Sequence, residues 1–426
     1  MTGKARSYAP AIILTVSLFF LWGMANNLND ILIAQFKKAF TLSDFETSFV
    51  QQAFYLGYFC LAVPAAMVVR AKGYKAAIVT GLLLYATGAL LFYPAAHFGE
   101  YRYFLAALFV IASGLAFLET SANPLMTELG DPATATRRLN WAQAANPVGT
   151  LAGVLIGKYF ILSEIAHDDT AIAAMAPTAR AAFYRAETQA VQTPYLVIGL
   201  VVLGFALAAA LIRFPDARAE AGEDATPPFS RVFRHPRLLF AAVAQFFYVG
   251  AQVGLWSYTI RYAQFNVPGM IERTAADYLF ASLVLFSIGR FVGTAMMSRI
   301  APTRLLTAFA AGALVLAIGA ALVGGLAGLM MLVAASFFLS IQFPTIFALG
   351  VDGLGPLRKA GASLIVMAII GGAAITAAMG HLSDVAGINT AMLVPAIAFI
   401  VVLLFARSAA RAGGRAIGDD NPVPIH

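Results

Sequence analysis

Long apolar stretches separated by short polar ones follow one another from residue 8 to residue 408. A helix needs about 20 apolar residues to cross the roughly 30 Å hydrocarbon core of a bilayer. By that length the pattern predicts twelve spanning helices, at residues 8–36, 45–69, 75–96, 102–127, 138–163, 193–213, 237–263, 275–298, 303–323, 327–350, 358–384 and 388–408. The pattern therefore predicts an all-α membrane protein. An even number of spans places both termini on the same side of the membrane.

One polar segment divides these spans into two groups of six. The stretch RFPDARAEAGEDATPPFSRVFRHPR, at residues 213–237, is mixed in charge and carries four prolines, as interdomain linkers often do. We predict an N-terminal six-helix bundle at 1–213, a linker at 214–236, a C-terminal six-helix bundle at 237–410 and a tail at 411–426. FFLWG in the first span resembles FFYVG in the seventh, and ANPLMTELG in the fourth resembles QFPTIFALG in the tenth, which favours a duplicated unit.

Composition and charge support a membrane protein. The 426 residues are 60% hydrophobic and 12% charged, with a mean hydropathy of +0.80, which is too apolar for a soluble domain. The net charge of +7 does not indicate nucleic acid binding, because Lys and Arg fall at the ends of apolar stretches and form no basic face. If the N-terminus is cytoplasmic, 19 of the 28 Lys and Arg lie on the cytoplasmic side and 7 outside. The positive-inside rule then predicts cytoplasmic termini in the inner membrane.

Two acids stand within apolar stretches, where an ionisable side chain needs a partner, water or a proton. Asp30 lies about 9 Å and Glu119 about 24 Å from the outer ends of their predicted helices, at 1.5 Å per residue. Burial disfavours the charged form of a carboxyl, so groups at two depths are suited to passing a proton inward. The alternative for Asp30 is a hydrated helix end. The alternative for Glu119 is an ion pair inside the bundle, with Arg290.

Uncharged amides are more numerous in the predicted spans. An amide both donates and accepts hydrogen bonds, which suits the hydroxyls of a sugar better than an anion. If their helices face one cavity, these side chains line it; the alternative is that they only bridge helices. They are Asn26, Asn27, Asn29, Asn123, Asn140, Gln143, Asn146, Gln245, Gln252 and Gln342.

Other patterns point to packing, and none to catalysis. Gly149, Gly153 and Gly157 recur at a spacing of four and predict a close helix contact. No Cys/His cluster, phosphate-binding glycine loop or nucleophile arrangement is present in the sequence. We therefore expect neither an enzyme nor a protein with a metal or cofactor.

Several segments resemble the fucose permease branch of the major facilitator superfamily. The resemblance runs over nearly the whole chain and is most specific in FFLWGMANNLNDILIAQF at residues 19–36 and GLAFLETSANP at 114–124. It implies the major facilitator fold, with Asp30 and Glu119 as proton-coupling acids and Glu119 also in sugar recognition. It further implies that Asn27, Gln143 and Asn146 line the cavity. In the wider superfamily an acid precedes the basic residues of the loop after the second helix, whereas Val69 stands there in this chain.

The patterns and the resemblance together predict a proton-coupled sugar symporter, most simply for L-fucose, that works by alternating access. We expect the substrate to contact Asn27, Glu119, Gln143, Asn146, Gln252 and Gln342. The expected partners are the sugar, a proton and the lipid bilayer, and we expect a monomer. Glucose, galactose or an amino sugar is the alternative substrate, by symport or uniport, and a non-transporting membrane sensor is the alternative class.

Overall fold

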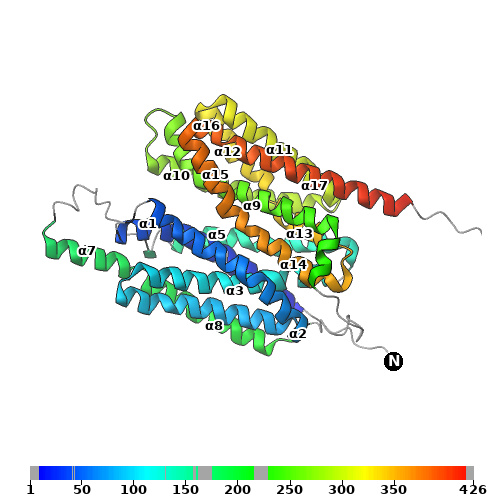
Figure 1. Cartoon of the computed structure of the whole chain (residues 1–426), viewed down its shortest axis with the longest axis horizontal. Coiled ribbons are helices and arrows are strands. Elements are labelled where there is room, and N and C mark those ends of the chain that lie inside the picture. The colour runs from blue at the N-terminus through cyan, green and yellow to red at the C-terminus, as the bar shows by residue number, and fades with distance from the viewer. Residues whose placement is uncertain are drawn as a thin grey trace, which may run out of the picture. The chain divides into compact units, whose positions relative to one another are not determined.

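The computed structural model describes residues 9–40, 42, 44–129, 131–156, 160–161, 175–214 and 229–418, and the regular elements within them are helices (Figure 1). Ten segments of this described part are long and apolar enough to span a membrane. One of them, residues 49–98, has room for two spans. The predicted span at 138–163 corresponds to α4 (Ala135–Gln143) and α5 (Ala145–Ile156), which are separated at Ala144. The twelve predicted spans thus each match helical residues.

Glycines with positive φ mark several helix boundaries. Gly73, at φ 85°, is the non-helical point inside α2 (Asp44–Phe98) and separates the two spans predicted there. Gly324, at φ 63°, ends α11 (Pro302–Val323) and precedes α12 (Gly325–Leu339). A positive φ costs glycine little, so the chain turns at these points without strain.

The chain divides into two compact units. The N-terminal unit comprises Met1–Met126 and Ala145–Thr226, and the C-terminal unit comprises Thr127–Ala144 and Pro227–His426. Residues 127–144, which lie before the predicted linker, thus group with the later helices. The boundaries predicted for the bundles and the linker remain predictions, and most of the linker lies outside the described residues.

The N-terminal unit contains α1 (Ala9–Ala39), α2, most of α3 (Tyr101–Glu128), α5, α7 (Pro177–Gln189) and α8 (Gln192–Leu211). In it α1 packs closely on α5, and α2 packs closely on α8. Helix α7 lies in the segment between the spans predicted at 138–163 and 193–213. It begins at a proline, which suits the first turn of a helix because that turn's N–H groups have no intrahelical partner.

The C-terminal unit adds α9 (Pro236–Asn266), α10 (Glu272–Met296), α11, α12, α13 (Gln342–Val351), α14 (Arg358–Met367), α15 (Gly371–Ala386), α16 (Ile388–Ala391) and α17 (Leu393–Gly418), with α4 packed on α13. The predicted spans at 327–350 and 358–384 are therefore each two consecutive helices. Short 3-10 turns at Phe229–Arg234, Gly355–Leu357 and Ala368–Ile370 connect parts of this unit.

Matching glycines make a matching helix crossing in each unit. In the N-terminal unit Gly149 of α5 lies so close to α1 that an added Cβ would overlap the carbonyl oxygen of Phe20. In the C-terminal unit Gly371 of α15 lies the same way against Phe246 of α9. Phe20 and Phe246 fall in the two similar sequences FFLWG and FFYVG. Phe20 is the second residue of its motif and Phe246 the first, so the two glycine contacts are similar and differ by one residue in position.

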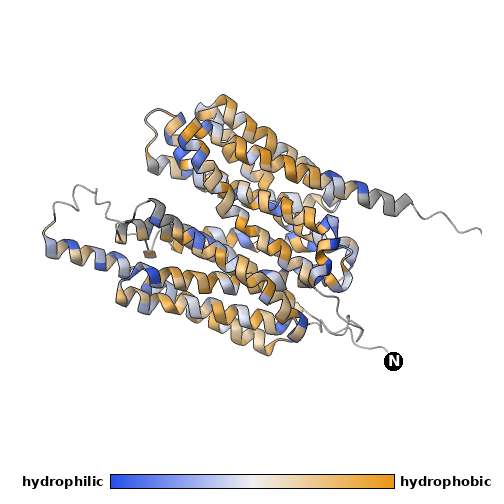
Figure 2. Cartoon of the chain, viewed as in Figure 1, coloured by the Kyte–Doolittle hydropathy of each residue, from blue (hydrophilic) through white to orange (hydrophobic). Residues whose placement is uncertain are grey.

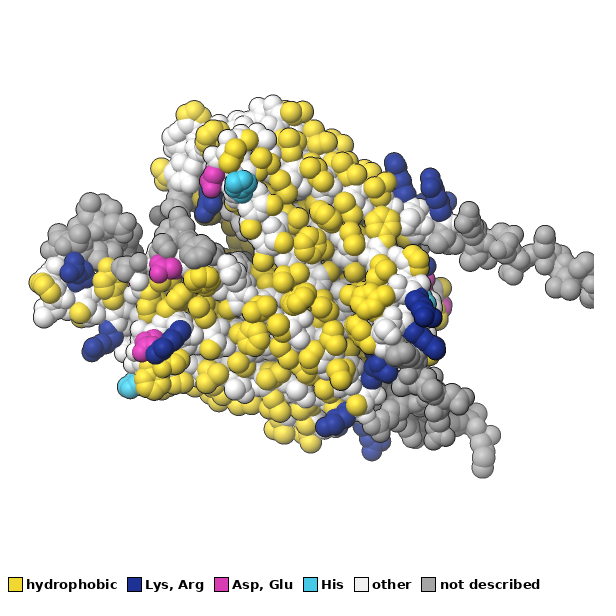
Figure 3. All heavy atoms as spheres, viewed as in Figure 1, with side chains coloured by type: hydrophobic (Ala, Val, Ile, Leu, Met, Phe, Trp, Pro, Cys, Tyr) yellow, Lys and Arg dark blue, Asp and Glu magenta, His cyan; other side chains and the backbone are white. Residues whose placement is uncertain are grey.

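The surface suits lipid. Hydropathy is high along the helices, with hydrophilic residues concentrated near their ends (Figure 2). Hydrophobic side chains cover most of the face in Figure 3, and Lys and Arg gather near the helix ends. Large apolar side chains such as Leu211 and Leu322 are 76% exposed, which in water would be costly but in a bilayer is favourable.

Candidate functional site

Glu119 is the deepest predicted acid whose side chain the structure describes. It lies on α3 and is 2% exposed, and neither carboxylate oxygen has a hydrogen-bond partner among the residues that the structure describes. The alternative for this carboxyl, an ion pair with Arg290, would join the two units and stays a prediction. The Tyr58 phenol on α2, itself 1% exposed, lies within electrostatic range of Glu119. The carboxyl thus has unused hydrogen-bonding capacity close to a buried phenol.

Asn27 and Asn146 both lie along the crossing of α1 and α5, each close to a glycine of the other helix. A Cβ on Gly153 would lie 3.2 Å from the Cβ of Asn27, and one on Gly23 would lie 3.1 Å from the Cγ of Asn146. The Oδ1 atom of Asn27 is buried and has no hydrogen-bond partner. The glycines thus bring two predicted sugar-contacting amides onto one crossing, and Asn27 keeps a free acceptor there.

Asp30 lies on α1, but its side chain is outside the described residues. Its helix continues to Ala39, so the residue sits well before the helix end. The backbone thus gives the position of Asp30 along α1 and leaves its proton-coupling role a prediction.

Gln143 lies in the C-terminal unit, bonded to a buried arginine. Arg290 of α10 is 3% exposed, and its Nη1 donates to both the side-chain Oε1 and the backbone oxygen of Gln143, each at 3.3 Å. Its guanidinium also lies 5.1 Å from the ring centroid of Phe286, and it interacts electrostatically with Tyr248. The Nε of Arg290 has no hydrogen-bond partner. A buried cation is therefore held by an amide and aromatic rings and retains one donor.

The other two predicted amides differ from each other. Gln342, at the start of α13, is fully buried; its Nε2 donates to the Phe338 carbonyl at 2.9 Å, and its Oε1 has no partner. Gln252 on α9 is half-buried. Gln245 on α9, an amide outside the predicted set of sugar contacts, is fully buried, and neither of its amide atoms has a hydrogen-bond partner among the described residues.

Sequence reasoning missed three parts of this arrangement: Tyr58, the bond between Arg290 and Gln143, and a buried acid, Glu187 of α7. Glu187 is 4% exposed and accepts a hydrogen bond from Gln35 of α1. Two sequence signals favour a helix there: the proline at its start and its many Ala, Arg, Glu and Gln residues, which have high helix propensity. Among the described residues no group of three or more His, Cys, Asp or Glu side chains is placed to hold a metal ion.

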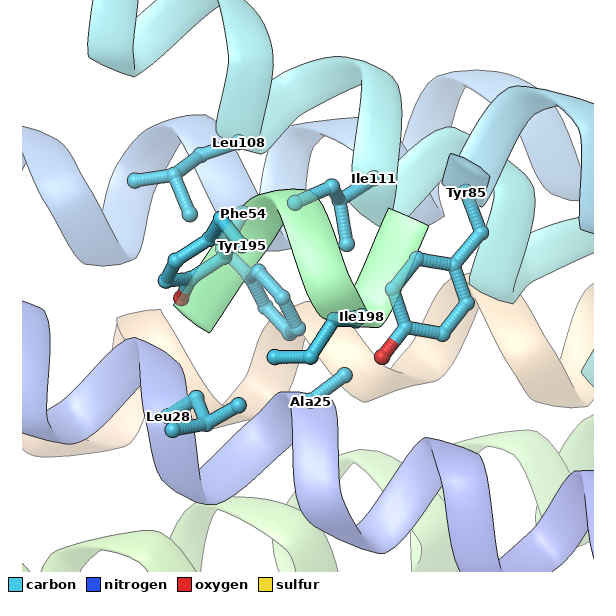
Figure 4. A pocket seen from close by; sticks show the side chains of 8 residues that line it. All are labelled: Ala25, Leu28, Phe54, Tyr85, Leu108, Ile111, Tyr195 and Ile198. Carbon is cyan, nitrogen blue, oxygen red and sulfur yellow. The ribbon is translucent and has the colours of Figure 1, made fainter. Parts of the chain in front are cut away.

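A small cavity lies inside the N-terminal unit (Figure 4). It has about 10 Å³ of free volume, room for one water molecule, and is far below the several hundred Å³ that a ligand pocket needs. Apolar side chains line it except for the hydroxyls of Tyr85 and Tyr195, and Tyr85 donates weakly to the Leu21 carbonyl at 3.4 Å. It is a packing gap among helices and not a sugar site. Its lining residues are Ala25, Leu28, Phe54, Tyr85, Leu108, Ile111, Tyr195 and Ile198.

A sequence profile of the Major Facilitator Superfamily matches residues 13–378 of the chain. The chain belongs to this superfamily. The fold class predicted from the sequence, an all-α membrane protein of the major facilitator type, is thereby confirmed. Membership makes the chain a multi-pass membrane protein.

Individual relatives match almost end to end. The chain is 46% identical over 412 residues to the L-fucose-proton symporter of Escherichia coli (strain K12), which covers 95% of this chain and 94% of that protein. It is 34% identical over 405 residues to a glucose/galactose transporter of Brucella abortus biovar 1 (strain 9-941), with 95% of each chain covered. A crystal structure of a Major Facilitator Superfamily transporter, FucP, in the outward conformation matches with a TM-score of 0.87 and 46% identity, covering 95% of this chain and 99% of that one. The resemblance to the fucose permease branch is confirmed.

Proposed function

We propose that the protein is a proton-coupled sugar symporter whose substrate is L-fucose and that works by alternating access in the inner membrane. The observation that carries the proposal is the Glu119 carboxyl, buried without a hydrogen-bond partner, in a chain 46% identical to an L-fucose-proton symporter. The relatives named above are transporters, which supports transport over sensing or catalysis.

Glu119 is the proton-coupling group in this proposal. An ionised carboxylate without donors in an apolar setting is poorly compensated, and either a proton or the hydroxyls of a bound sugar supply what it lacks. Sugar and proton therefore favour the same state of the site, which is the condition for symport. Asp30, nearer the outer end of α1, receives the proton from the outside.

The amides recognise the sugar. Asn27 and Asn146, along the crossing of α1 and α5, and Gln143, Gln252 and Gln342 of the other unit supply paired donors and acceptors. Arg290 donates a hydrogen bond to the side-chain oxygen of Gln143, which fixes the direction of that amide. The termini are cytoplasmic, as the positive-inside rule indicates, and one chain forms the transport unit.

The driving force is sufficient for accumulation. One proton crossing 100 mV releases about 2.3 kcal/mol, and a difference of one pH unit adds about 1.4 kcal/mol. Together these sustain a sugar gradient of several hundredfold, since each 1.4 kcal/mol is about tenfold.

The test is proton flux into proteoliposomes on addition of L-fucose. Alkalinisation of the outside, in step with uptake of labelled sugar, is the expected result. Uptake without alkalinisation would make the protein a uniporter.

Glucose or galactose is the second candidate substrate, because the relative from Brucella abortus is named a glucose/galactose transporter and is 34% identical. Competition of unlabelled L-fucose, D-glucose and D-galactose against labelled L-fucose uptake separates the two. Stronger competition by glucose than by fucose itself would reassign the substrate.

A further inference from the structure

Glu187 and Gln35 form a buried polar pair between two helices of the N-terminal unit. Gln35 of α1 is 2% exposed and Glu187 of α7 is 4% exposed. The Gln35 Nε2 donates to the Glu187 carboxylate Oε2 at 2.8 Å and to the Glu187 backbone oxygen at 2.9 Å. The Gln35 amide thus donates to both the side chain and the main chain of Glu187 on α7.

This pair links α1 and α7 through two hydrogen bonds from one amide group. A buried carboxylate is stable only where donors compensate it, and a hydrogen bond to a charged acceptor is stronger than one between neutral groups. The neighbouring Thr188 does not add to the link, because its hydroxyl donates within α7 to the Tyr184 carbonyl at 2.8 Å. Removing the Glu187 side chain leaves the Gln35 amide buried with a lost acceptor, which costs more than the bond itself contributes.

The place of this bond on α1 connects it to the transport site. Gln35 lies five residues beyond Asp30 and eight beyond Asn27, about 7.5 and 12 Å along the axis at 1.5 Å per residue. Nearer the start of the helix, α1 is fixed against α5 at Gly23. The segment of α1 with Asn27 and Asp30 therefore has a fixed contact on each side: the packing of Gly23 on α5 before it, and the hydrogen bond of Gln35 to Glu187 after it.

We propose that Glu187 is a positioning residue for proton-coupled sugar transport: by accepting the hydrogen bond of Gln35 it sets the segment of α1 that carries Asn27 and Asp30. The inference rests on the proposed function, since it takes Asn27 as a sugar contact and Asp30 as a proton carrier. Glu187 itself carries no proton in this scheme, and its acceptor oxygen is what matters.

The test compares three variants in proteoliposomes. Glu187→Leu removes the acceptor, Gln35→Met removes the donor at nearly constant volume, and Glu187→Gln keeps an acceptor oxygen without the charge. We expect Glu187→Leu and Gln35→Met each to raise the KM for L-fucose about tenfold, the factor that one lost charge-assisted hydrogen bond corresponds to. The Glu187→Gln protein retains coupled accumulation. The double variant, Glu187→Leu with Gln35→Met, has a KM for L-fucose no higher than that of either single variant, because both changes remove the same bond.

Three outcomes would overturn the inference. Loss of accumulation in Glu187→Gln with sugar exchange intact would make Glu187 a proton carrier. A wild-type KM in both Gln35→Met and Glu187→Leu would leave the pair without a role. Additive effects in the double variant would mean that the two residues act separately. If Glu187→Leu does not fold, the Gln35→Met and Glu187→Gln proteins decide the matter on their own.

Amide hydrogen exchange over residues 27–35 measures how firmly this segment of α1 is held, and it does so independently of which substrate is transported. Faster exchange in Gln35→Met but not in Glu187→Gln is expected whether or not L-fucose is the substrate. Absence of coupled fucose uptake in the wild-type protein would refute the proposed function, and unchanged exchange in Gln35→Met would refute the positioning.

Discussion

Arg290 and Gln143 are bonded to each other although 147 residues separate them in the chain. The arginine reaches two oxygens of the same glutamine, one from its side chain and one from its backbone. Both residues are at least 97% buried, so water does not replace a lost partner. The pair ties α4 to α10 within the C-terminal unit and fixes the amide of a predicted sugar contact.

Replacing Gln143 with Leu removes the side-chain acceptor of a buried cation. We expect the free energy of unfolding to fall by about 1–3 kcal/mol, the range for a buried polar group left unsatisfied. Thermal unfolding in detergent measures the loss. Gln252→Leu is the matched control, because that half-buried amide has no hydrogen bond among the described residues. Equal melting temperatures for the two variants would show that Arg290 does not depend on Gln143.

Replacing Glu119 with Gln mimics the protonated carboxyl and cannot release a proton. We expect exchange of labelled for unlabelled sugar to continue while accumulation driven by a pH difference is lost. The pH dependence has a definite sign: wild-type uptake rises as the outside becomes more acidic, because the protonated form binds sugar, whereas exchange by Glu119→Gln does not vary with pH. Both are measured in proteoliposomes with labelled L-fucose. Proton movement that persists in step with sugar uptake by Glu119→Gln would assign coupling to another residue.

Replacing Asp30 with Asn tests the outer proton station. We expect vesicles with Asp30→Asn to equilibrate sugar but not to concentrate it under an imposed pH difference, since the outer group can no longer take up a proton. Asp277→Asn is the matched control, because Asp277 is an exposed acid on α10. If Asp30→Asn vesicles accumulate sugar as the control does, Asp30 is a hydrated helix-end residue and not an obligatory coupling group.

The spanning helices could be predicted because their signal is local. A run of about 20 apolar residues identifies a span whatever it packs against. Breaks within spans are marked only weakly in the sequence: α12 and α13 separate at Ser340 and Ile341, where Ser340 and Gln342 interrupt the apolar run shortly before Pro344. Helix α7 has no apolar run of that length, so the pattern of spans does not mark it.

The site was predictable only in its residue types. A carboxyl in an apolar stretch requires explanation wherever it lies, which singled out Glu119 from the sequence alone. Its neighbour Tyr58 and the pair of Gln35 and Glu187 depend on contacts between helices far apart in the chain. No spacing pattern encodes such a contact, so these partners required the structure.

The two matching glycine crossings allow one further prediction, on the repeat. Gly149→Ala and Gly371→Ala each place a methyl group against a backbone oxygen of the facing helix, which cannot move aside as a side chain end does. We expect each to lower the free energy of unfolding by about 1–3 kcal/mol, as overpacking of a close contact does. Gly204→Ala on α8 is the matched control, because an added Cβ there meets nothing within 4 Å, and alanine favours a helix over glycine by about 1 kcal/mol. Thermal unfolding in detergent should therefore rank Gly204→Ala at or above wild type and the other two below it. A wild-type melting temperature for Gly371→Ala alone would mean that the repeat is one of sequence and not of packing.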